Sequence, residues 1–250
     1  MLIDDTTLLA LLIFLAASLY STVGHAGASG YIAAMAFVGV AAVEMKPTAL
    51  TLNILVASIG TFRLWRAGLI NPRALLPLIV FSIPMAFIGG AVQLPVSAYR
   101  IAVGAVLLFA GLRLLLDPRE KAVQQRGHGD VAIPLPAAMI AGAGIGLLSG
   151  LTGTGGGIFL SPLLLLLGWA GARQAAGMAA PFILLNSISG LAGNIVSLQS
   201  LPAELPIYAG AALAGALLGT QLAIRWLPVR LLQYLLGAVL LVAAVKLILT

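Results

Sequence analysis

The stretch that decides the fold is Gly150-Leu151-Thr152-Gly153-Thr154-Gly155-Gly156-Gly157. A related run, Val23-Gly24-His25-Ala26-Gly27-Ala28-Ser29-Gly30, lies near the N-terminus. Both runs are small, polar and helix-weakening, yet each lies between long apolar segments. In lipid, backbone outside a helix persists only where it is buried in protein or lines a cavity. We therefore predict that both runs are turns inside a membrane protein and candidate ligand sites.

The composition excludes a soluble globular protein. Of the 250 residues, 61% are hydrophobic and only 8% are charged, which is too little charge for a soluble surface. At about 20 apolar residues per crossing, the chain holds about eight to ten membrane segments. With no cysteine and two histidines, we expect no disulfide, no metal and no other cofactor. The N-terminus, where Asp4 and Asp5 precede the first apolar run, lacks the basic start of a signal peptide, so we expect it to belong to the mature chain.

The apolar segments form two sets of five. We place them at about 7–22, 31–43, 47–65, 74–92 and 97–116, and at about 133–149, 158–171, 175–197, 204–223 and 230–249. A polar connection at 117–132 separates the first repeat, 1–116, from the second, 133–250. The run Gly104-Ala105-Val106-Leu107-Leu108 recurs as Gly237-Ala238-Val239-Leu240-Leu241, and Ala28-Ser29-Gly30 falls opposite Gly155-Gly156-Gly157. These matches predict an internal duplication.

The basic residues predict the orientation, and they account for the formal charge of +6 without any nucleic-acid partner. If the loop 117–130 is cytoplasmic, Lys46, Arg100 and Lys246 fall outside and both termini lie outside. The other 10 of the 13 basic residues then lie inside: Arg63, Arg66, Arg73, Arg113, Arg119, Lys121, Arg126, Arg173, Arg225 and Arg230. An odd number of segments in each half makes the two halves inverted copies, as in many secondary transporters.

The second and seventh segments predict how each half opens. Each has about 13 residues, or about 20 Å of helix, against a hydrocarbon core of about 30 Å. We therefore expect a re-entrant or broken hairpin whose tip is the Gly-rich run, although ten tilted crossings would give the same topology. The predicted fold is an all-α polytopic membrane protein with two inverted repeats of about five helical segments each.

The tips are predicted to bind an anion. The helices after the tips begin at about Ser29-Gly30 and Gly156-Gly157, where the first N–H groups lack intrahelical acceptors and carry the positive end of the helix dipole. Close helix packing is the alternative use of these glycines. We favour packing for Gly142 and Gly146 and the binding site for the second tip. The predicted site consists of His25, Gly27, Ser29, Gly30, Asn53, Thr152, Gly153, Thr154, Gly155, Gly156, Gly157, Asn186 and Ser187.

Three of these side chains carry alternatives. His25 is an anion donor when protonated, a proton carrier, or a neutral residue that stabilises the tip by bonding a backbone carbonyl. Asn53 and Asn186 lie in mid-segment, where they either face the site or hydrogen-bond neighbouring helices. We favour the site for Asn186 and Ser187, because Pro181 is expected to kink their helix toward the tips.

No enzyme motif accompanies these residues. The sequence contains no GxSxG, no HExxH and no phosphate-binding loop with its lysine. All seven acidic residues lie at segment ends or in loops, which argues against a sodium site built on intramembrane carboxylates. We therefore expect a protein that is not an enzyme.

The run Gly146-Leu147-Leu148-Ser149-Gly150-Leu151-Thr152-Gly153-Thr154-Gly155-Gly156-Gly157-Ile158-Phe159-Leu160-Ser161-Pro162, within a duplicated small membrane protein, resembles the TauE/SafE family of sulfite exporters and sulfonate permeases. The resemblance implies a secondary transporter of sulfite, thiosulfate, sulfoacetate or a related sulfur anion across the cytoplasmic membrane. An anion channel with the same tips in its pore, or a non-transporting membrane scaffold subunit, is the alternative. The direction of transport, the coupling ion, for which protons are a candidate, and the oligomeric state, a homo-oligomer included, stay open.

Overall fold

The protein is helical throughout the part that its computed structural model describes. The described residues are 4–22, 24–116, 133–170, 172–195, 200–222, 238, 240–241 and 244–249, and no strand occurs among them. The helices are α1 (Asp5–Thr22), α2 (Ala28–Val38), α3 (Ala42–Arg66), α4 (Pro72–Ala91), α5 (Val96–Leu116), α7 (Leu135–Thr152), α8 (Gly157–Leu166), α9 (Ala172–Gly193) and α10 (Leu205–Leu222). The all-α prediction is confirmed. The predicted loop 117–132 and most of the segment 230–249 lie outside the described residues.

Within the described part of the chain, four helices are long and apolar enough to cross a membrane. They are α3, α4, α7 and the Gln174–Gly193 part of α9. By contrast, α2 has 11 residues and α8 has 10, so they are about 16 Å and 15 Å long, or half of a hydrocarbon core. The expectation that the second and seventh segments are too short to span is confirmed.

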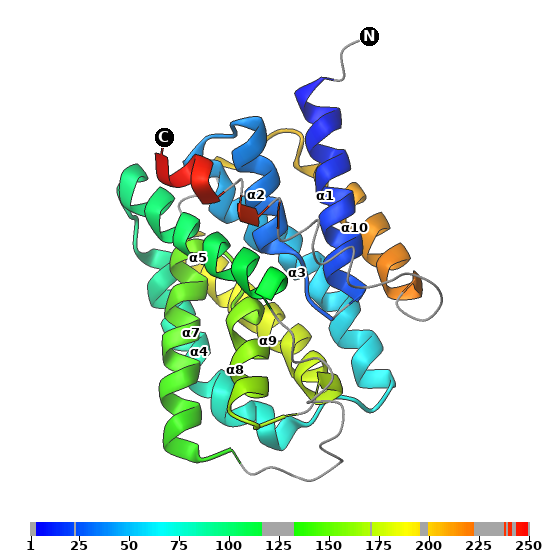
Figure 1. Ribbon diagram of the computed structural model, residues 1–250, viewed down its shortest axis with the longest axis vertical. Helices are drawn as coiled ribbons and strands as arrows, with labels where there is room; N and C mark the ends of the chain where they lie inside the picture. The colour runs from blue at the N-terminus through cyan, green and yellow to red at the C-terminus, as the bar shows by residue number, and fades with distance from the viewer. Residues whose placement is uncertain are drawn as a thin grey trace.

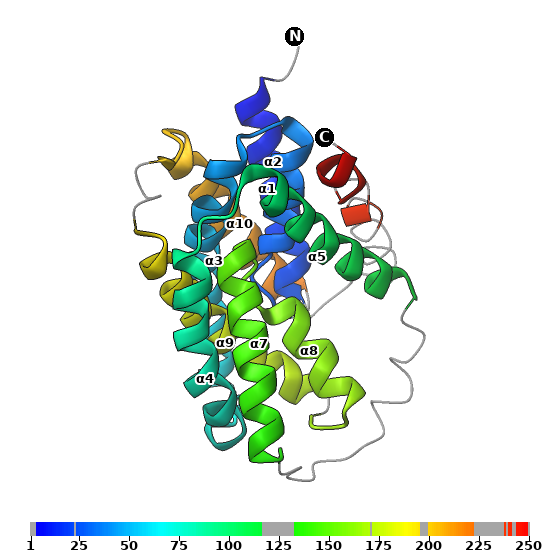
Figure 2. The same cartoon turned by 90° about the vertical axis from the view of Figure 1, so that its left-hand side faces the viewer.

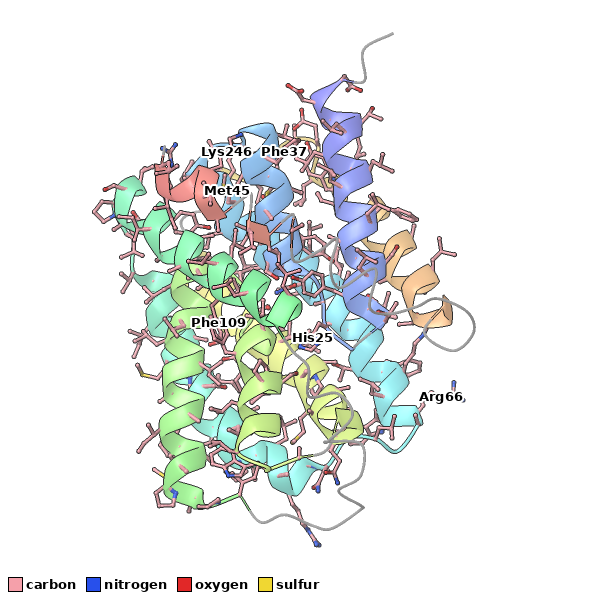
Figure 3. All side chains as sticks on the ribbon, in the orientation of Figure 1. His25, Phe37, Met45, Arg66, Phe109 and Lys246 are labelled. Carbon is pink, nitrogen blue, oxygen red and sulfur yellow. The ribbon has the colours of Figure 1, made fainter. Side chains whose placement is uncertain are left out.

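The two short helices complete two hairpins that point toward each other. In Figures 1 and 2, α1 descends from the upper end, and α2 returns there from a turn near mid-height. From the lower end, α7 rises to a second turn near mid-height, and α8 descends again. Figure 3 shows Lys246 at the upper end of the molecule and Arg66 toward the lower end.

The start of α3 differs from the prediction. The sequence placed the third segment at about 47–65, but α3 begins at Ala42 and contains Pro47, a residue that disfavours a helix interior. Proline has no N–H to offer the carbonyl of Val43 four residues earlier, and the hydroxyl of Ser200 donates to that oxygen over 3.5 Å. Lys46, which we expected at an outer segment end, therefore lies inside the helix and is buried.

Glycines bring α7 against the backbone of α4. A Cβ atom added at Gly142, Gly146 or Gly150 would lie 2.3, 2.2 or 2.1 Å from the carbonyl oxygens of Leu78, Ser82 and Ala86. Only a residue without a side chain fits at such distances, and membrane helices use small residues in this way. The packing interpretation of Gly142 and Gly146 is confirmed.

The same helix crossing occurs twice in the molecule. A Cβ atom at Gly89 of α4 would lie 2.4 Å from the oxygen of Leu147 in α7, and one at Gly219 of α10 would lie 2.1 Å from the oxygen of Ser18 in α1. Gly219 follows Gly89 by 130 residues, and Leu147 follows Ser18 by 129. The α1–α10 pair thus repeats the α7–α4 pair, as a duplication requires.

Candidate anion-binding site

The two Gly-rich tips share a backbone conformation. The first has left-handed glycines at Gly24 (φ +78°) and Gly27 (φ +104°), and the second has them at the corresponding Gly153 (φ +82°) and Gly156 (φ +81°). The second tip has one more, Gly155 (φ +75°), where the first has Ala26 outside the left-handed region. In each tip the second of the corresponding glycines, Gly27 or Gly156, directly precedes the short helix. The left-handed region favours glycine because the Cβ atom of an L-residue clashes with its own backbone there.

This conformation corrects the alignment of the two halves. The sequence placed Ala28-Ser29-Gly30 opposite Gly155-Gly156-Gly157, whereas the structure places Ala28 opposite Gly157 at the start of its short helix. The sequence alignment was two residues out of register because it matched small residues. The structural equivalence instead follows the positions where the backbone needs a positive φ.

Each tip presents a run of backbone N–H groups without acceptors. Among the described residues, the N–H groups of 26–30 and of 154–158 form no hydrogen bond, and regular helical bonding resumes at Tyr31 and Phe159. All ten residues are buried except Ile158, which is half-buried. More than 90% of buried backbone N–H groups in proteins are paired. Two runs of unpaired donors at helix N-termini are therefore suited to bind an anion.

His25 joins the two tips. Its Nε2 lies 3.2 Å from the carbonyl oxygen of Gly157 and 3.0 Å from the hydroxyl oxygen of Ser161. Gly157 and Ser161 belong to α8, so the imidazole reaches from the first tip to the helix that follows the second (Figure 3). The contact with a carbonyl is the one expected of a tip-stabilising histidine. The roles of His25 as an anion donor or proton carrier stay predictions.

Side chains from α3 and α9 surround the second tip. A Cβ atom at Gly155 would lie 2.5 Å from Nδ2 of Asn53 and 3.0 Å from the hydroxyl of Ser187. Asn53 donates to Ser187 over 3.3 Å, and both residues are fully buried. Oδ1 of Asn53 has no partner among the described residues. Asn53 and Ser187 therefore line the tip and also join the two helices.

Asn186 bonds α4, while its Oδ1 is buried with no partner among the described residues, so its place in the site stays a prediction. Its Nδ2 donates to the hydroxyl of Ser82 in α4 over 3.0 Å and to the carbonyl of Phe182 over 2.8 Å. These bonds join α9 to α4, which is the interhelical role that we had weighed as the alternative. Neighbouring residues of a helix point about 100° apart, which explains why Ser187 reaches the tip while Asn186 bonds α4.

The hydroxyls of the tips already have partners within the protein. Ser29 shares a 2.5 Å hydrogen bond with the hydroxyl of Tyr20. Thr152 donates to the carbonyl of Leu148 over 2.7 Å and lies 3.0 Å from the hydroxyl of Thr154. The backbone N–H groups therefore offer more unused donors to a ligand than these hydroxyls do.

Sequence reasoning missed two groups at the second tip. The Ser149 hydroxyl is buried with no partner among the described residues, and its Cβ lies 3.4 Å from where a Gly156 Cβ would stand. Tyr99 of α5 donates from its hydroxyl to the carbonyl of Thr152 over 3.3 Å. Ser149 was visible within the Gly-rich run, but nothing in the local sequence places Tyr99 at the tip.

Comparison with known proteins identifies the family. Residues 9–247 match the model of the family described as "Sulfite exporter TauE/SafE". The chain is also 38% identical over 240 residues to the "Probable membrane transporter protein y4hK" of Sinorhizobium fredii (strain NBRC 101917 / NGR234), covering 96% of this chain and 97% of that protein. No solved structure matches. On the strength of a match that spans both hairpins and nearly the whole chain, this protein belongs to the TauE/SafE family of membrane transporters.

Proposed function

We propose that this protein is a secondary transporter of a small sulfur-containing oxyanion, such as sulfite, thiosulfate or sulfoacetate, in the cytoplasmic membrane. The observation that carries the proposal is the pair of buried N–H runs at 26–30 and 154–158. Such donors bind an anion without a formal charge of their own. The family's description as sulfite exporters supports sulfur as the central atom of that anion.

The two repeats, 1–116 and 133–250, are proposed to have inverted topologies and to rock against each other around the anion. The glycine crossing that occurs once in α4–α7 and again in α1–α10 supports this arrangement, and so do two hairpins whose tips meet near mid-height (Figure 2). Inverted repeats and broken helices that meet near the bilayer midplane are the architecture of many alternating-access carriers.

The anion is proposed to bind between the start of α2 and the start of α8, where both N–H runs and both helix dipoles contribute. Gly155 and Gly157 let it approach the backbone closely, and Asn53 and Ser187 flank it on the side of α3 and α9. His25 bridges the tips and is the proposed carrier of a coupling proton.

The substitution Gly157→Leu tests the site. Gly157 begins α8 outside the left-handed region, so the backbone tolerates a side chain, but a Cβ there would lie 2.3 Å from Cδ1 of Ile183. Gly144→Leu is the matched control, because Gly144 of α7 is exposed and has no atom within 4 Å of a Cβ. The measurements are thermal unfolding of the purified protein with thiosulfate and sulfite, and counterflow of the same anions in proteoliposomes.

We expect an anion at a hundred times its Kd to stabilise the wild type and Gly144→Leu by about 2.7 kcal/mol. In Gly157→Leu this stabilisation and the counterflow should be lost while the protein still inserts. Normal counterflow by Gly157→Leu would overturn the site. Large single-channel currents without counterflow would show a channel. A wild type without any anion response, together with a Gly157→Leu variant as stable as the wild type, would indicate a scaffold.

A further inference from the structure

A buried lysine lies beside the second tip. Lys46, in the second turn of α3, is only 7% exposed and is the one charged side chain that is buried among the described residues. A charge inside a membrane protein is costly to bury, so it is rare and usually functional. Nothing in the proposed function so far uses this charge.

The partners of Lys46 are neutral. Its Nζ donates to the carbonyl oxygens of Gly89 (3.2 Å), Gly90 (2.9 Å) and Val92 (3.3 Å) at the C-terminal end of α4. A cation is favoured at that end of a helix dipole, which explains how the ammonium is tolerated. No carboxylate within the described part of the chain pairs with it, so its positive charge is not cancelled.

The stem of Lys46 touches the second tip. A Cβ atom at Gly153 would lie 3.2 Å from Cα and 3.3 Å from Cγ of Lys46. The end of α4 that receives the ammonium is itself packed on the end of α7, because a Cβ at Gly89 would lie 2.9 Å from the backbone nitrogen of Leu151. The charge, the end of α4 and the tip therefore meet in one place.

We infer that Lys46 supplies the positive charge that accompanies the transported anion at the second tip. This inference rests on the proposed function and names a further binding residue for it. In the state seen here the three ammonium protons are held by three carbonyls. A flexible four-carbon stem lets the ammonium exchange a carbonyl for an anion at the neighbouring backbone N–H groups, and an ionised acceptor makes the stronger hydrogen bond.

A purely structural role makes a different prediction. If Lys46 only caps α4, a neutral side chain that still donates to the carbonyls should preserve function. Lys46→Gln keeps such a donor and removes the charge. Lys246→Gln is the matched control, because the ammonium of Lys246 also donates to a backbone carbonyl, that of Phe37 over 2.7 Å, at the upper end of the molecule (Figure 3).

The experiment measures thiosulfate and sulfite binding to the purified full chain by thermal shift and calorimetry. We expect Lys46→Gln to lower the affinity by at least about tenfold, because hydrogen bonds to charged groups are worth more than neutral ones. Lys46→Arg and Lys246→Gln should stay within about threefold of the wild type, since neither removes the charge at the tip. A correctly inserted Lys46→Gln that binds like the wild type would overturn the inference.

Lys46→His provides a test within one folded variant. Imidazole gains a proton in mildly acid solution, so thiosulfate should bind this variant at pH 5.5 and about tenfold more weakly at pH 8. The wild type should change little between these two values. Equal binding by Lys46→His at both values would again overturn the inference. A wild type that binds neither anion would instead refute the proposed function and leave the family assignment untouched.

Discussion

The two tips share two left-handed glycines but are packed in different ways. The first is filled mainly by its own hairpin: a Cβ at Gly27 would lie 2.9 Å from the ring of Tyr31, and one at Gly30 would lie 2.8 Å from Ala16. Gly24 faces α9, where a Cβ would lie 3.2 Å from Ala176. The second is filled by other helices, since Gly155 and Gly157 face Asn53 of α3 and Ile183 of α9. Both tips touch α9, but among the tip glycines only those of the second tip face α3, so its surroundings are the ones that must change when α3 moves.

This difference separates two uses of glycine. Gly24 and Gly153, like Gly27 and Gly156, are shared by the tips and have positive φ, so the turn itself requires them. Gly157 is not shared, because Ala28 begins the equivalent helix in the first hairpin. Close approach by Ile183 explains Gly157.

The largest effect is expected from the shared glycines. Gly24→Ala and Gly153→Ala should each lower the free energy of unfolding by about 1–2 kcal/mol, because an L-residue in the left-handed region carries that strain. Thermal unfolding of the purified protein measures the loss, with Gly144→Ala as the control at an open helical position. If Gly24→Ala and Gly153→Ala were as stable as Gly144→Ala, the left-handed conformation would not be the reason for glycine at positions 24 and 153.

A smaller effect is expected from the bridge between the tips. His25→Ala removes the contacts with Gly157 and Ser161 and should lower anion affinity about fivefold, since a net hydrogen bond is worth about 1 kcal/mol. His25→Gln retains a donor and should recover most of that affinity. Uptake driven by a pH gradient in proteoliposomes separates the roles, because neither variant carries a proton. Gradient-driven uptake that survives in His25→Gln would exclude His25 as the proton carrier.

The smallest effect is expected from the two asparagines. Asn53→Ala and Asn186→Ala each remove an interhelical hydrogen bond, and each should cost about 0.6 kcal/mol of stability. Only Asn53→Ala should also alter anion affinity, because Asn53 touches Gly155 whereas Asn186 bonds α4. Equal changes of thiosulfate affinity in both variants, measured by calorimetry, would contradict this assignment.

Much of the fold could be predicted because it depends on local sequence. Apolar runs separated by polar turns predicted the helices, and the short runs after the tips predicted α2 and α8. The start of α3 could not be predicted, because Pro47 is tolerated inside the helix with a distant hydroxyl, that of Ser200, at the freed carbonyl of Val43. The register of the two tips was missed for a related reason, since composition does not report φ.

The sequence by itself determined the class of protein, the place of both tips in the chain, and the family. These follow from composition and from motifs a few residues long. Only the tertiary structure decided which donors remain unpaired, that His25 reaches α8, that Asn186 bonds α4, and that Lys46 is buried beside Gly153. Hydrogen-bond satisfaction and burial are properties of groups far apart in the chain, so no local pattern of residues encodes them.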